Sequence, residues 1–480
     1  MNYGQFLNMI PEATLVAILL IIFCADFCLH KSERKSGVLY ILTAVLLALQ
    51  LVPCLLSQPA EAFGGLYVAS SMANVMKTIL TAGTLIVVIM AQAWLNNNQK
   101  YAGEFYMLVV STLLGMYMMI SSGNFLMFFL GLETASVPMA CLVAFDRLKK
   151  DSAEAAAKYI LTATFSSGVM LYGISFLYGA TGTLYFDDMA QRLSQSAFYT
   201  ADWGLCIAGL VFFFSGLGFK LSLVPFHLWT ADTYQGAPTP VTGYLSVVSK
   251  GAAALALCII LSKVFGSMFE AWQMLLGVVI VLTITVGNLF AIRQSELKRF
   301  MAFSSISQAG YIMLAVLGNT EMGAAALTYY VLVYVAANMA VFTVINVVER
   351  NGGNTQMACY NGFYQTNPKL SLLMTLALFS LAGIPPFAGM FSKFFVFMAA
   401  AGEGSFLAYF VVFIALINTV VSLYYYLLIV KAMYITKTET PLPTFRSDCN
   451  TRLALALCTA GVVAFGVVSC VYSWIANAAL

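Results

Sequence analysis

Charged residues are scarce in this sequence: Asp, Glu, Lys and Arg make up only 9% of its 480 residues, whereas 61% are hydrophobic. Soluble domains carry about 25% charged residues, so the composition excludes a soluble globular protein. Long polar stretches are also missing, and apolar runs of about 20 residues, the length of a bilayer-crossing helix, recur from end to end. The formal net charge of +3 gives no support to a nucleic-acid partner. We therefore expect a single integral membrane domain, 1–480, of the all-α polytopic class.

Motifs for redox cofactors and metals are missing as well. The 10 cysteines lie mostly inside apolar runs and form no CxxC pair, which argues against a disulfide framework, a zinc site or an iron–sulfur centre. Gly216 and Gly218 form an isolated GxG without the strand, third glycine or downstream acid of a dinucleotide fingerprint. The N-terminus has no basic region before its first apolar run, so we expect that run to be kept as a helix. We predict no cofactor and no metal in this chain.

The apolar runs predict about fourteen membrane-spanning helices. Their expected residues are 11–30, 37–56, 71–95, 105–121, 124–145, 155–179, 203–228, 239–263, 271–291, 299–317, 323–348, 370–400, 406–431 and 452–475. Most of the 23 Lys and Arg residues fall in or beside the odd-numbered loops between these spans. Because basic loops stay on the cytoplasmic side, we expect these loops in the cytoplasm and both termini on the outer side.

Charged side chains inside the predicted spans are the strongest functional signal. The lysines among them are Lys77, Lys158, Lys220, Lys250 and Lys393. We expect Lys77 to reach water by snorkelling, and Lys158 either to do the same or to extend a charge network toward the cytoplasm. The other three lysines lie too deep for that escape, as does Glu133, the one acid expected to be well buried. Such residues are costly in a membrane and usually functional.

Two spans contain helix breaks next to deep lysines. Pro225 follows Lys220 in KLSLVPFH, and a Pro-Pro pair precedes Lys393 in IPPFAGMFSK. Proline removes a backbone donor and clashes with the preceding turn. Irregular backbone at membrane depth is tolerated only where protein or a hydrated cavity surrounds it, so each break marks such a place.

The two breaks also indicate an internal duplication. Lysine precedes proline in the first span and follows it in the second, and the two spans run in opposite directions under the predicted topology. Paired broken helices are typical of transporters built from repeats. We predict two inverted five-helix repeats, 104–265 and 270–435, with 1–103 and 436–480 as flanking helices.

Five motifs give the sequence a resemblance to a known family. They are GLETASVP around Glu133, EAAAKYILTATFSSG around Lys158, FKLSLVPFHLWTADTYQGAPTPVT around Lys220, LKRFMAFSSISQAGY from Leu297, and LAGIPPFAGMFSKF around Lys393. With these motifs in order over essentially the whole chain, the sequence resembles the antiporter-like subunits of respiratory complex I. Within that family it is most similar to the subunit N type of bacterial NADH:quinone oxidoreductase.

The resemblance implies a proton-translocating subunit coupled to quinone reduction in other subunits. It implies that Glu133 is an electrostatic switch paired with Lys220, the central proton holder. Lys250 is then the middle relay, and Lys393 passes the proton toward the outer face. His227 is either a proton shuttle or a hydrogen-bonded anchor beside a tryptophan. NADH, flavin, iron–sulfur clusters and quinone would belong to partner subunits, so the chain would be an enzyme only as part of that complex.

Two positions depart from the family pattern. The family often reads PDVYEG where this sequence has ADTYQG, from Ala231 to Gly236. A proline and an acid are therefore absent from an expected cytoplasmic loop, and Gln235 stands where the acid would be. Related subunits often carry histidine where Gln308 stands. Because glutamine does not titrate, a relay through that position must use hydrogen-bonded water.

Two other functions fit some of these features. A subunit of a multi-chain cation/proton antiporter would share the fold and the Glu–Lys–Lys plan, but VPFHLWTADTYQGAPTPVT is closer to subunit N. A structural scaffold with paired lysines would not need two broken helices. We expect the chain in a bacterial cytoplasmic (inner) membrane, with peripheral, membrane and other antiporter-like subunits of complex I as partners.

Overall fold

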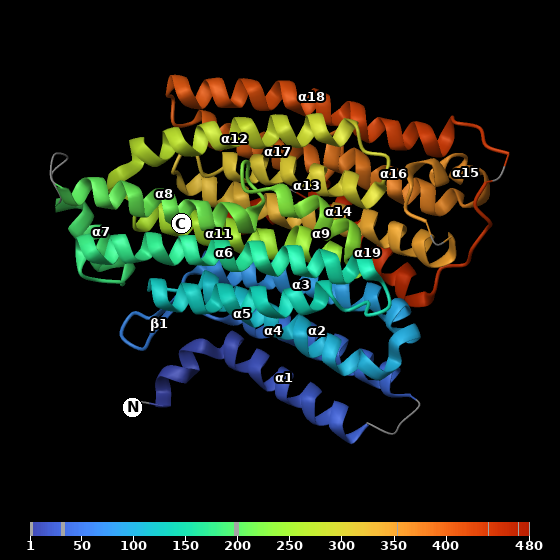
Figure 1. Ribbon diagram of the computed structural model, residues 1–480, viewed down its shortest axis with the longest axis horizontal. Coiled ribbons are helices and arrows are strands. Elements are labelled where there is room, and N and C mark those ends of the chain that lie inside the picture. The colour runs from blue at the N-terminus through green and yellow to red at the C-terminus, as the bar shows by residue number, and fades with distance from the viewer. Residues whose placement is uncertain are drawn as a thin grey trace.

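The computed structural model describes residues 3–29, 34–195, 201–352, 354–439, 441–468 and 470–479, and these residues are mostly helical. The long helices run roughly along one direction and form a single bundle (Figure 1). Twelve helical segments are long and apolar enough to cross a membrane, and two shorter apolar helices follow one another within the expected span 370–400. The predicted multi-pass, all-helical class is confirmed.

A described helix occupies each of the predicted spans. The helices of the first half are α1 (Ile10–Cys28), α2 (Lys35–Leu56), α3 (Ser71–Leu95), α4 (Ala102–Ile120), α5 (Phe125–Val143), α6 (Lys150–Thr181), α8 (Ala201–Leu221), α9 (Leu228–Gly236), α10 (Thr239–Tyr244) and α11 (Lys250–Lys263). Those of the second half are α12 (Phe269–Ile292), α13 (Leu297–Leu314), α14 (Glu321–Gly352), α16 (Pro368–Ala382), α17 (Ala388–Ala401), α18 (Phe406–Tyr434), α19 (Cys449–Val467) and α20 (Cys470–Ala479).

Shorter elements cover the ends of the bundle. They are the 3-10 helices η1 (Tyr3–Met9), η2 (Asn96–Tyr101), η4 (Gly266–Met268) and η5 (Met357–Tyr360), the helices α7 (Phe186–Gln195) and α15 (Phe363–Thr366), and the antiparallel strands β1 (Ala60–Ala62) and β2 (Tyr67–Ala69). The register of the strand pair places Glu61 opposite Val68. The label of β1 lies at the same end of the bundle as that of α7 (Figure 1).

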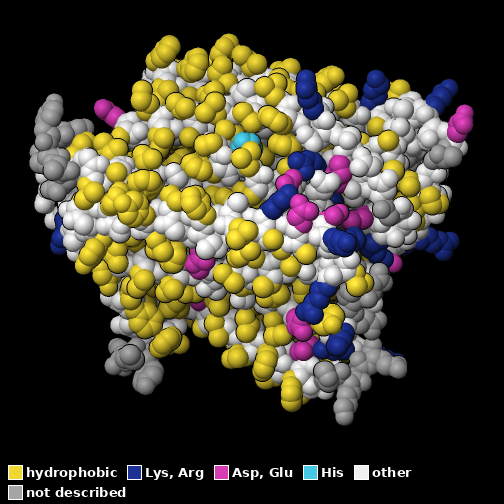
Figure 2. Space-filling view, in the orientation of Figure 1, with side chains coloured by type: hydrophobic (Ala, Val, Ile, Leu, Met, Phe, Trp, Pro, Cys, Tyr) yellow, Lys and Arg dark blue, Asp and Glu magenta, His cyan; other side chains and the backbone are white. Residues whose placement is uncertain are grey.

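Helix α14 forms much of the core, because nearly all of its side chains from Ala325 to Val348 are buried. It contacts helices from both halves of the chain, including α3, α16, α17 and α19. The peripheral helices α1 and α2 instead expose leucine, isoleucine and phenylalanine on their outer faces. Apolar side chains therefore fill both the interior and much of the surface (Figure 2), as in a helix bundle surrounded by lipid.

Both predicted helix breaks are present. Helix α8 ends at Leu221, and after the Pro225 segment the chain becomes helical again at α9. Helix α16 ends at Ala382 and is followed by Gly383, whose φ of 90° favours glycine, and α17 begins beyond the two prolines. One backbone group at the first break is satisfied by a neighbouring helix: the N–H of Val224 donates to Thr283 Oγ1 at 3.0 Å. The inverted repeats 104–265 and 270–435 stay a prediction, and each contains one of these breaks.

Two local features differ from the sequence-based expectations. The segment Ala231–Gly236, expected as a loop, lies within α9, because the chain resumes its helix soon after Pro225. The expected uninterrupted span 239–263 contains a π-helical turn, η3 (Leu245–Ser249), between α10 and α11. Such turns occur frequently at functional sites, and this one ends directly before Lys250.

Charged side chains gather toward one end of the bundle. On the face shown in Figure 2, most Lys and Arg side chains lie toward the end that carries α15, and α16 is labelled on the same side in Figure 1. The N and C labels lie toward the opposite end.

Candidate functional site

Three of the predicted lysines are buried in the bundle. Lys220 at the end of α8, Lys250 at the start of α11 and Lys393 in α17 expose only 4%, 1% and 4% of their surfaces. In the parts of the chain that the structure describes, none of the three ammonium groups forms an ion pair with a carboxylate. Each is instead held by neutral oxygen atoms. Their predicted depth is confirmed.

Lys220 lies against α5 and α6. Its Nζ donates hydrogen bonds to Ser136 Oγ at 2.8 Å and to the Tyr159 hydroxyl at 3.2 Å. The Ser136 hydroxyl in turn donates to the carbonyl of Leu132 at 2.7 Å, so its oxygen is free to accept from the ammonium group. Lys220 also faces the ring of Tyr159, 5.9 Å from its centre. The hydroxyl groups and the ring stabilise the ammonium group of Lys220 without supplying a negative counter-charge.

Glu133 is less buried than the sequence suggested. It is half-buried on α5 and accepts a hydrogen bond from Ser167 Oγ of α6 at 2.5 Å. It shares a helical face with Leu126, Leu130 and Val137, which are about half exposed, so the expectation of a well-buried acid is wrong. The implied direct pairing with Lys220 is not formed among the described contacts. Ser136, one helical turn further along α5, occupies that place.

Lys250 contacts the neighbouring helix α13. Its Nζ donates to Ser305 Oγ at 2.8 Å and to the Ser305 carbonyl at 3.2 Å. The Ser305 hydroxyl also lies 3.4 Å from the hydroxyl of Tyr234 in α9. In the π-helical turn directly before Lys250, the Ser246 hydroxyl accepts a hydrogen bond from Asn338 Nδ2 at 2.7 Å. Lys250 therefore sits where the first broken helix, the π-helical turn and α13 meet.

Lys393 of α17 connects the two helices on either side of the break in the second half, because it bonds the last residue of α16. Its Nζ donates at 2.9 Å to the carbonyl of Ala382, at the end of α16, and lies 5.0 Å from the centre of the Tyr311 ring. A cation next to free helix C-terminal carbonyls is favourably placed. Lys393 and Gln308 line the same small cavity, whose volume of about 10 Å³ is close to that of a single water site.

Gln308 is held by hydrogen bonds on both sides of its amide. Its Nε2 donates to the Tyr426 hydroxyl at 3.2 Å and to the Leu381 carbonyl at 3.3 Å, and Tyr330 donates its hydroxyl proton to Oε1. Gln308 follows Ser305 by one turn of α13, so one helix carries the contacts of both Lys250 and Lys393. The amide is thus fixed between the two lysines.

Aromatic side chains connect the surroundings of Lys220 and Lys250. The Tyr159 ring lies 5.2 Å from Trp229, and Trp229 lies 6.4 Å from Tyr234, measured between ring centres. Because Tyr159 bonds Lys220 and the Tyr234 hydroxyl reaches the serine that bonds Lys250, hydroxyl groups flank this aromatic cluster on both sides. These tyrosines and serines were not predicted from the sequence. Tyr159, Ser136 and Ser305 lie within the motifs that carry the family resemblance, which was the available signal.

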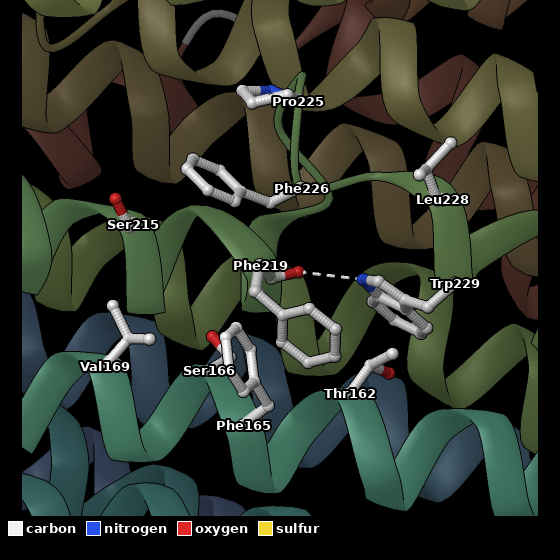
Figure 3. Close-up of a pocket in the computed structure, with 10 residues that line it drawn as sticks. All are labelled: Thr162, Phe165, Ser166, Val169, Ser215, Phe219, Pro225, Phe226, Leu228 and Trp229. Atoms are coloured by element: carbon white, nitrogen blue, oxygen red, sulfur yellow. Dashed lines mark hydrogen bonds between the residues drawn. The ribbon is translucent and has the colours of Figure 1, made fainter.

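A pocket of about 200 Å³ lies beside the first break (Figure 3). Pro225, Phe226 and Trp229 approach it from the break, and Phe165 of α6 lies opposite. The indole nitrogen of Trp229 donates to the Phe219 carbonyl at 3.1 Å, which ties α9 back to α8. The pocket is mostly apolar and opens on the outside of the bundle, where Phe165 is 76% exposed.

His227 is half-buried at the same break, directly before α9. In the described structure no hydrogen bond connects its side chain to any of the deep lysines. The residue that anchors this turn is Trp229, through its bond to Phe219. Both interpretations of His227, a proton shuttle and an anchor, stay predictions.

Lys158 belongs to a polar network at the charged end. Its Nζ lies 2.8 Å from both Glu154 and Asp232, and Asp232 also pairs with Arg299 at 2.6 Å. Arg299 donates to Gln235 Oε1 at 3.0 Å, so the glutamine that departs from the family pattern contacts this network through its oxygen. These side chains line a pocket of about 260 Å³. The interpretation of Lys158 as part of a charge network agrees with these contacts.

Lys77 does not reach water. Its side chain is fully buried and its Nζ lies 2.6 Å from Glu12 Oε1, an acid that is 96% buried by its side chain. Tyr67 accepts from Lys77 at 3.2 Å and donates to the other oxygen of Glu12 at 2.9 Å. The predicted snorkelling of Lys77 is therefore wrong. Sequence reasoning also missed the deep burial of Glu12, because its partner lies on a helix distant in sequence.

Lys298 was also missed, since its position near a helix end suggested a solvated loop residue. It is 3% exposed, donates to the Ala237 carbonyl at 2.8 Å and lies 3.8 Å from Glu349. Glu349 additionally accepts a hydrogen bond from Thr239 and pairs with Lys149 at 3.5 Å. This cluster connects the end of α9 to α14 near the start of the span that carries Lys250.

Metal-binding side chains are not clustered among the described residues: no three His, Cys, Asp or Glu side chains are placed to hold an ion. All cysteines are free thiols in the structure. The predicted lack of a cofactor in this chain stays a prediction.

Comparison with known proteins gives the family of this fold and site. Residues 122–421 match the family described as NADH:quinone oxidoreductase/Mrp antiporter, TM. The chain belongs to this family. The matching range contains Glu133, Lys220, Lys250 and Lys393, whereas Glu12 and Lys77 lie outside it.

Individual members of the family are similar over the whole chain. NADH-quinone oxidoreductase subunit N of Phocaeicola vulgatus is 56% identical over 100% of both chains. The subunit of the same name from Azobacteroides pseudotrichonymphae is 49% identical over 99% of this chain and 98% of its own.

Solved structures show the same fold. A chain of respiratory complex I from Thermus thermophilus is 30% identical, with a TM-score of 0.79 over 95% of this chain and 97% of that one. A chain of the Mrp complex from Dietzia sp. is 20% identical, with a TM-score of 0.84 over 98% and 97% of the two chains. The second likeness concerns the fold alone. The family fold is thus common to redox-linked and antiporter complexes.

Proposed function

We propose that this chain is the proton-translocating membrane subunit of an NADH:quinone oxidoreductase, complex I, in which it moves protons outward. Its full-length similarity at 56% identity to a subunit N supports the redox-linked complex over the antiporter alternative. The chain contributes to the enzyme as a subunit. NADH, flavin, iron–sulfur clusters and quinone are bound and oxidised or reduced by other polypeptides of the complex.

The observation that carries this proposal is the set of three buried lysines without carboxylate partners. A buried ion pair can serve a structural purpose. An unpaired buried ammonium group instead costs several kcal/mol, which is comparable to the net free energy of unfolding of a whole domain. Neutral oxygen atoms accept hydrogen bonds from the charged ammonium form of a lysine, and they also tolerate its neutral amine form. Each lysine can therefore lose and regain its proton without a trapped counter-charge.

The contacts support an order for the transfer. Lys220 donates to the Tyr159 hydroxyl, and on the other side of the aromatic cluster the Tyr234 hydroxyl contacts Ser305, which bonds Lys250. Because aromatic rings do not carry protons, water connects the two tyrosine hydroxyls in the proposed path. One turn beyond Ser305 on α13 lies Gln308, which shares a one-water cavity with Lys393. Glu133 acts from a distance: a change of charge at the outer face of α5 alters the free energy of the ammonium group beyond Ser136.

The proposed location is the bacterial cytoplasmic (inner) membrane, with both termini on the outer side. Its support is the concentration of Lys and Arg at the end of the bundle opposite the termini. Protons would then enter from the side of Lys158 and leave from the side toward which Lys393 passes them.

Co-purification tests this proposal. The chain is tagged in its own host, extracted from membranes in mild detergent and isolated with its partners. We expect polypeptides that carry flavin and iron–sulfur clusters, detected by absorbance and by mass spectrometry. Recovery of small antiporter subunits alone, in the absence of any redox polypeptide, would contradict the proposal and favour the cation/proton antiporter.

A further inference from the structure

A large cavity lies between α16 and α19, outside the lysine row. Its volume is about 740 Å³, and it is lined by the start of α16, the segment 444–447 and the first turns of α19. Helix α16 and the neighbouring α15 are labelled at the charged end of the bundle in Figure 1. Neither the proposed proton path nor the family motifs use this cavity.

The walls of the cavity are fixed by hydrogen bonds. Asn367 donates from Nδ2 to the Pro443 carbonyl at 3.0 Å, and its Oδ1 accepts from the backbone N–H of Phe445 at 3.2 Å. The Thr444 hydroxyl donates to the Thr366 carbonyl at 3.2 Å. The segment before α19 is therefore attached to the start of α16, and the cavity is a built feature of the fold.

Three cations line this cavity: Lys369, Arg446 and Arg452. All three are exposed, and no carboxylate in the described ranges lies within ion-pair distance of them. The neighbouring acid, Asp448, is engaged by Arg350, whose two terminal nitrogens each donate to it at 3.0 Å. The mouth of the cavity thus carries positive charge that this chain does not neutralise.

The rest of the cavity is apolar. Its lining includes Leu370, Leu373 and Leu455, and the exposed leucines Leu453 and Leu457 continue this surface along the outside of α19. One hydroxyl group lies among these side chains: the Oγ1 of Thr459 is buried and has no hydrogen-bond partner among the described residues. Along α19, the positive charge of Arg452 at the mouth of the cavity is followed by an apolar surface, and the unpartnered hydroxyl of Thr459 lies beyond Leu455.

We propose that this cavity binds an anionic phospholipid of the leaflet at the charged end of the bundle. The phosphate lies among Lys369, Arg446 and Arg452, and the acyl chains follow the leucines of α19. Thr459 donates its free proton to an ester oxygen. Basic pockets between membrane helices on the cytoplasmic side are suited to such headgroups. A soluble anion would use the cations but leave the apolar lining in contact with water.

Photolabelling of the intact complex tests this site. The complex is reconstituted in phosphatidylcholine vesicles that contain a trace of phosphatidylglycerol with a diazirine on one acyl chain. A parallel sample contains phosphatidylcholine with the same diazirine chain. After illumination, labelled peptides are mapped by mass spectrometry. We expect the anionic probe to label the peptides around α16 and α19 at least about tenfold more than the neutral probe, since each cation near the surface favours an anionic lipid.

Variants identify the groups responsible. The triple variant K369Q/R446Q/R452Q should reduce labelling by the anionic probe to that of the neutral probe. Its matched control, R293Q/K431Q/K437Q, removes three exposed cations that do not line the cavity and should label like the wild type. Ala456→Trp fills the cavity and keeps its charges, and it should abolish labelling there by both probes.

Several results would overturn the proposal. Equal labelling of the wild type by the two probes would mean an apolar crevice without headgroup selectivity. Unchanged labelling of the K369Q/R446Q/R452Q variant would show that these cations do not bind the lipid. No labelling of the cavity in the wild type would mean that a neighbouring polypeptide covers it. The wild-type comparison requires no variant, so it decides the question even where a substitution prevents assembly.

Discussion

The ammonium group of Lys220 donates to Ser136 Oγ at 2.8 Å, and this contact places the lysine one helical turn from Glu133 on α5. The serine hydroxyl is oriented by its own donation to Leu132 at 2.7 Å. It therefore presents lone pairs to the cation. A hydrogen bond to a charged group contributes about 1.5–3 kcal/mol, enough to influence how readily Lys220 keeps its proton.

Removing that hydroxyl should slow proton translocation without abolishing it. In Ser136→Ala, Lys220 keeps Tyr159 as an acceptor, so we expect a reduction of about threefold to tenfold in the initial rate of proton transport by reconstituted complex. Thr134→Val is the matched control, because the Thr134 hydroxyl only bonds the carbonyl of its own helix at Leu130. A Ser136→Ala rate equal to that of the control would show that the serine does not influence Lys220.

The ion pair of Glu12 and Lys77 should contribute to stability. Removing one partner leaves a buried charge without its counter-charge, at a cost of about 3–5 kcal/mol. We expect Lys77→Met and Glu12→Gln each to lower the thermal unfolding temperature of the isolated complex. The double variant should recover much of the loss, since neither charge is then left alone. Additive losses in the double variant would mean that the two side chains are not coupled.

Gln308 should be required for transfer between Lys250 and Lys393. Gln308→Leu keeps the side-chain size but leaves the hydroxyl of Tyr330 without its acceptor and removes a polar wall from the one-water cavity. We expect proton transport to fall at least about tenfold, because a broken hydrogen-bond chain cannot pass a proton. Gln308→His restores a polar, titratable group and should retain more transport than leucine. Full transport by the leucine variant would exclude a path through this position.

Sequence patterns predicted the fold well because the bilayer imposes simple constraints. Apolar length determined the spans, and Pro225 and the Pro-Pro pair marked both breaks. Depth within an apolar run correctly indicated that Lys250 is buried. These are local properties of the chain, so a single sequence contains them.

Partnerships between distant segments were not predictable in the same way. Lys77 lies close enough to a helix end to snorkel, and only the packing of α1 against its neighbours brings Glu12 within 2.6 Å. The outward position of Glu133 depends on the rotation of α5, which a helix apolar on all sides does not reveal. The π-helical turn before Lys250 likewise has no signature in the apolar pattern.

Transport by a Lys250→Met complex tests the lysine row most directly. Lys250 is 1% exposed, and among the described residues its ammonium group bonds the two oxygens of Ser305. Methionine therefore removes the titratable group and fits a similar volume. Lys263→Met is the control, since Lys263 lies on the same helix but is about half exposed at its outer end. The measurement is the number of protons moved per quinone reduced in sealed proteoliposomes. We expect a lower ratio for Lys250→Met and an unchanged one for Lys263→Met. An unchanged ratio in both variants would show that no transported proton passes through Lys250.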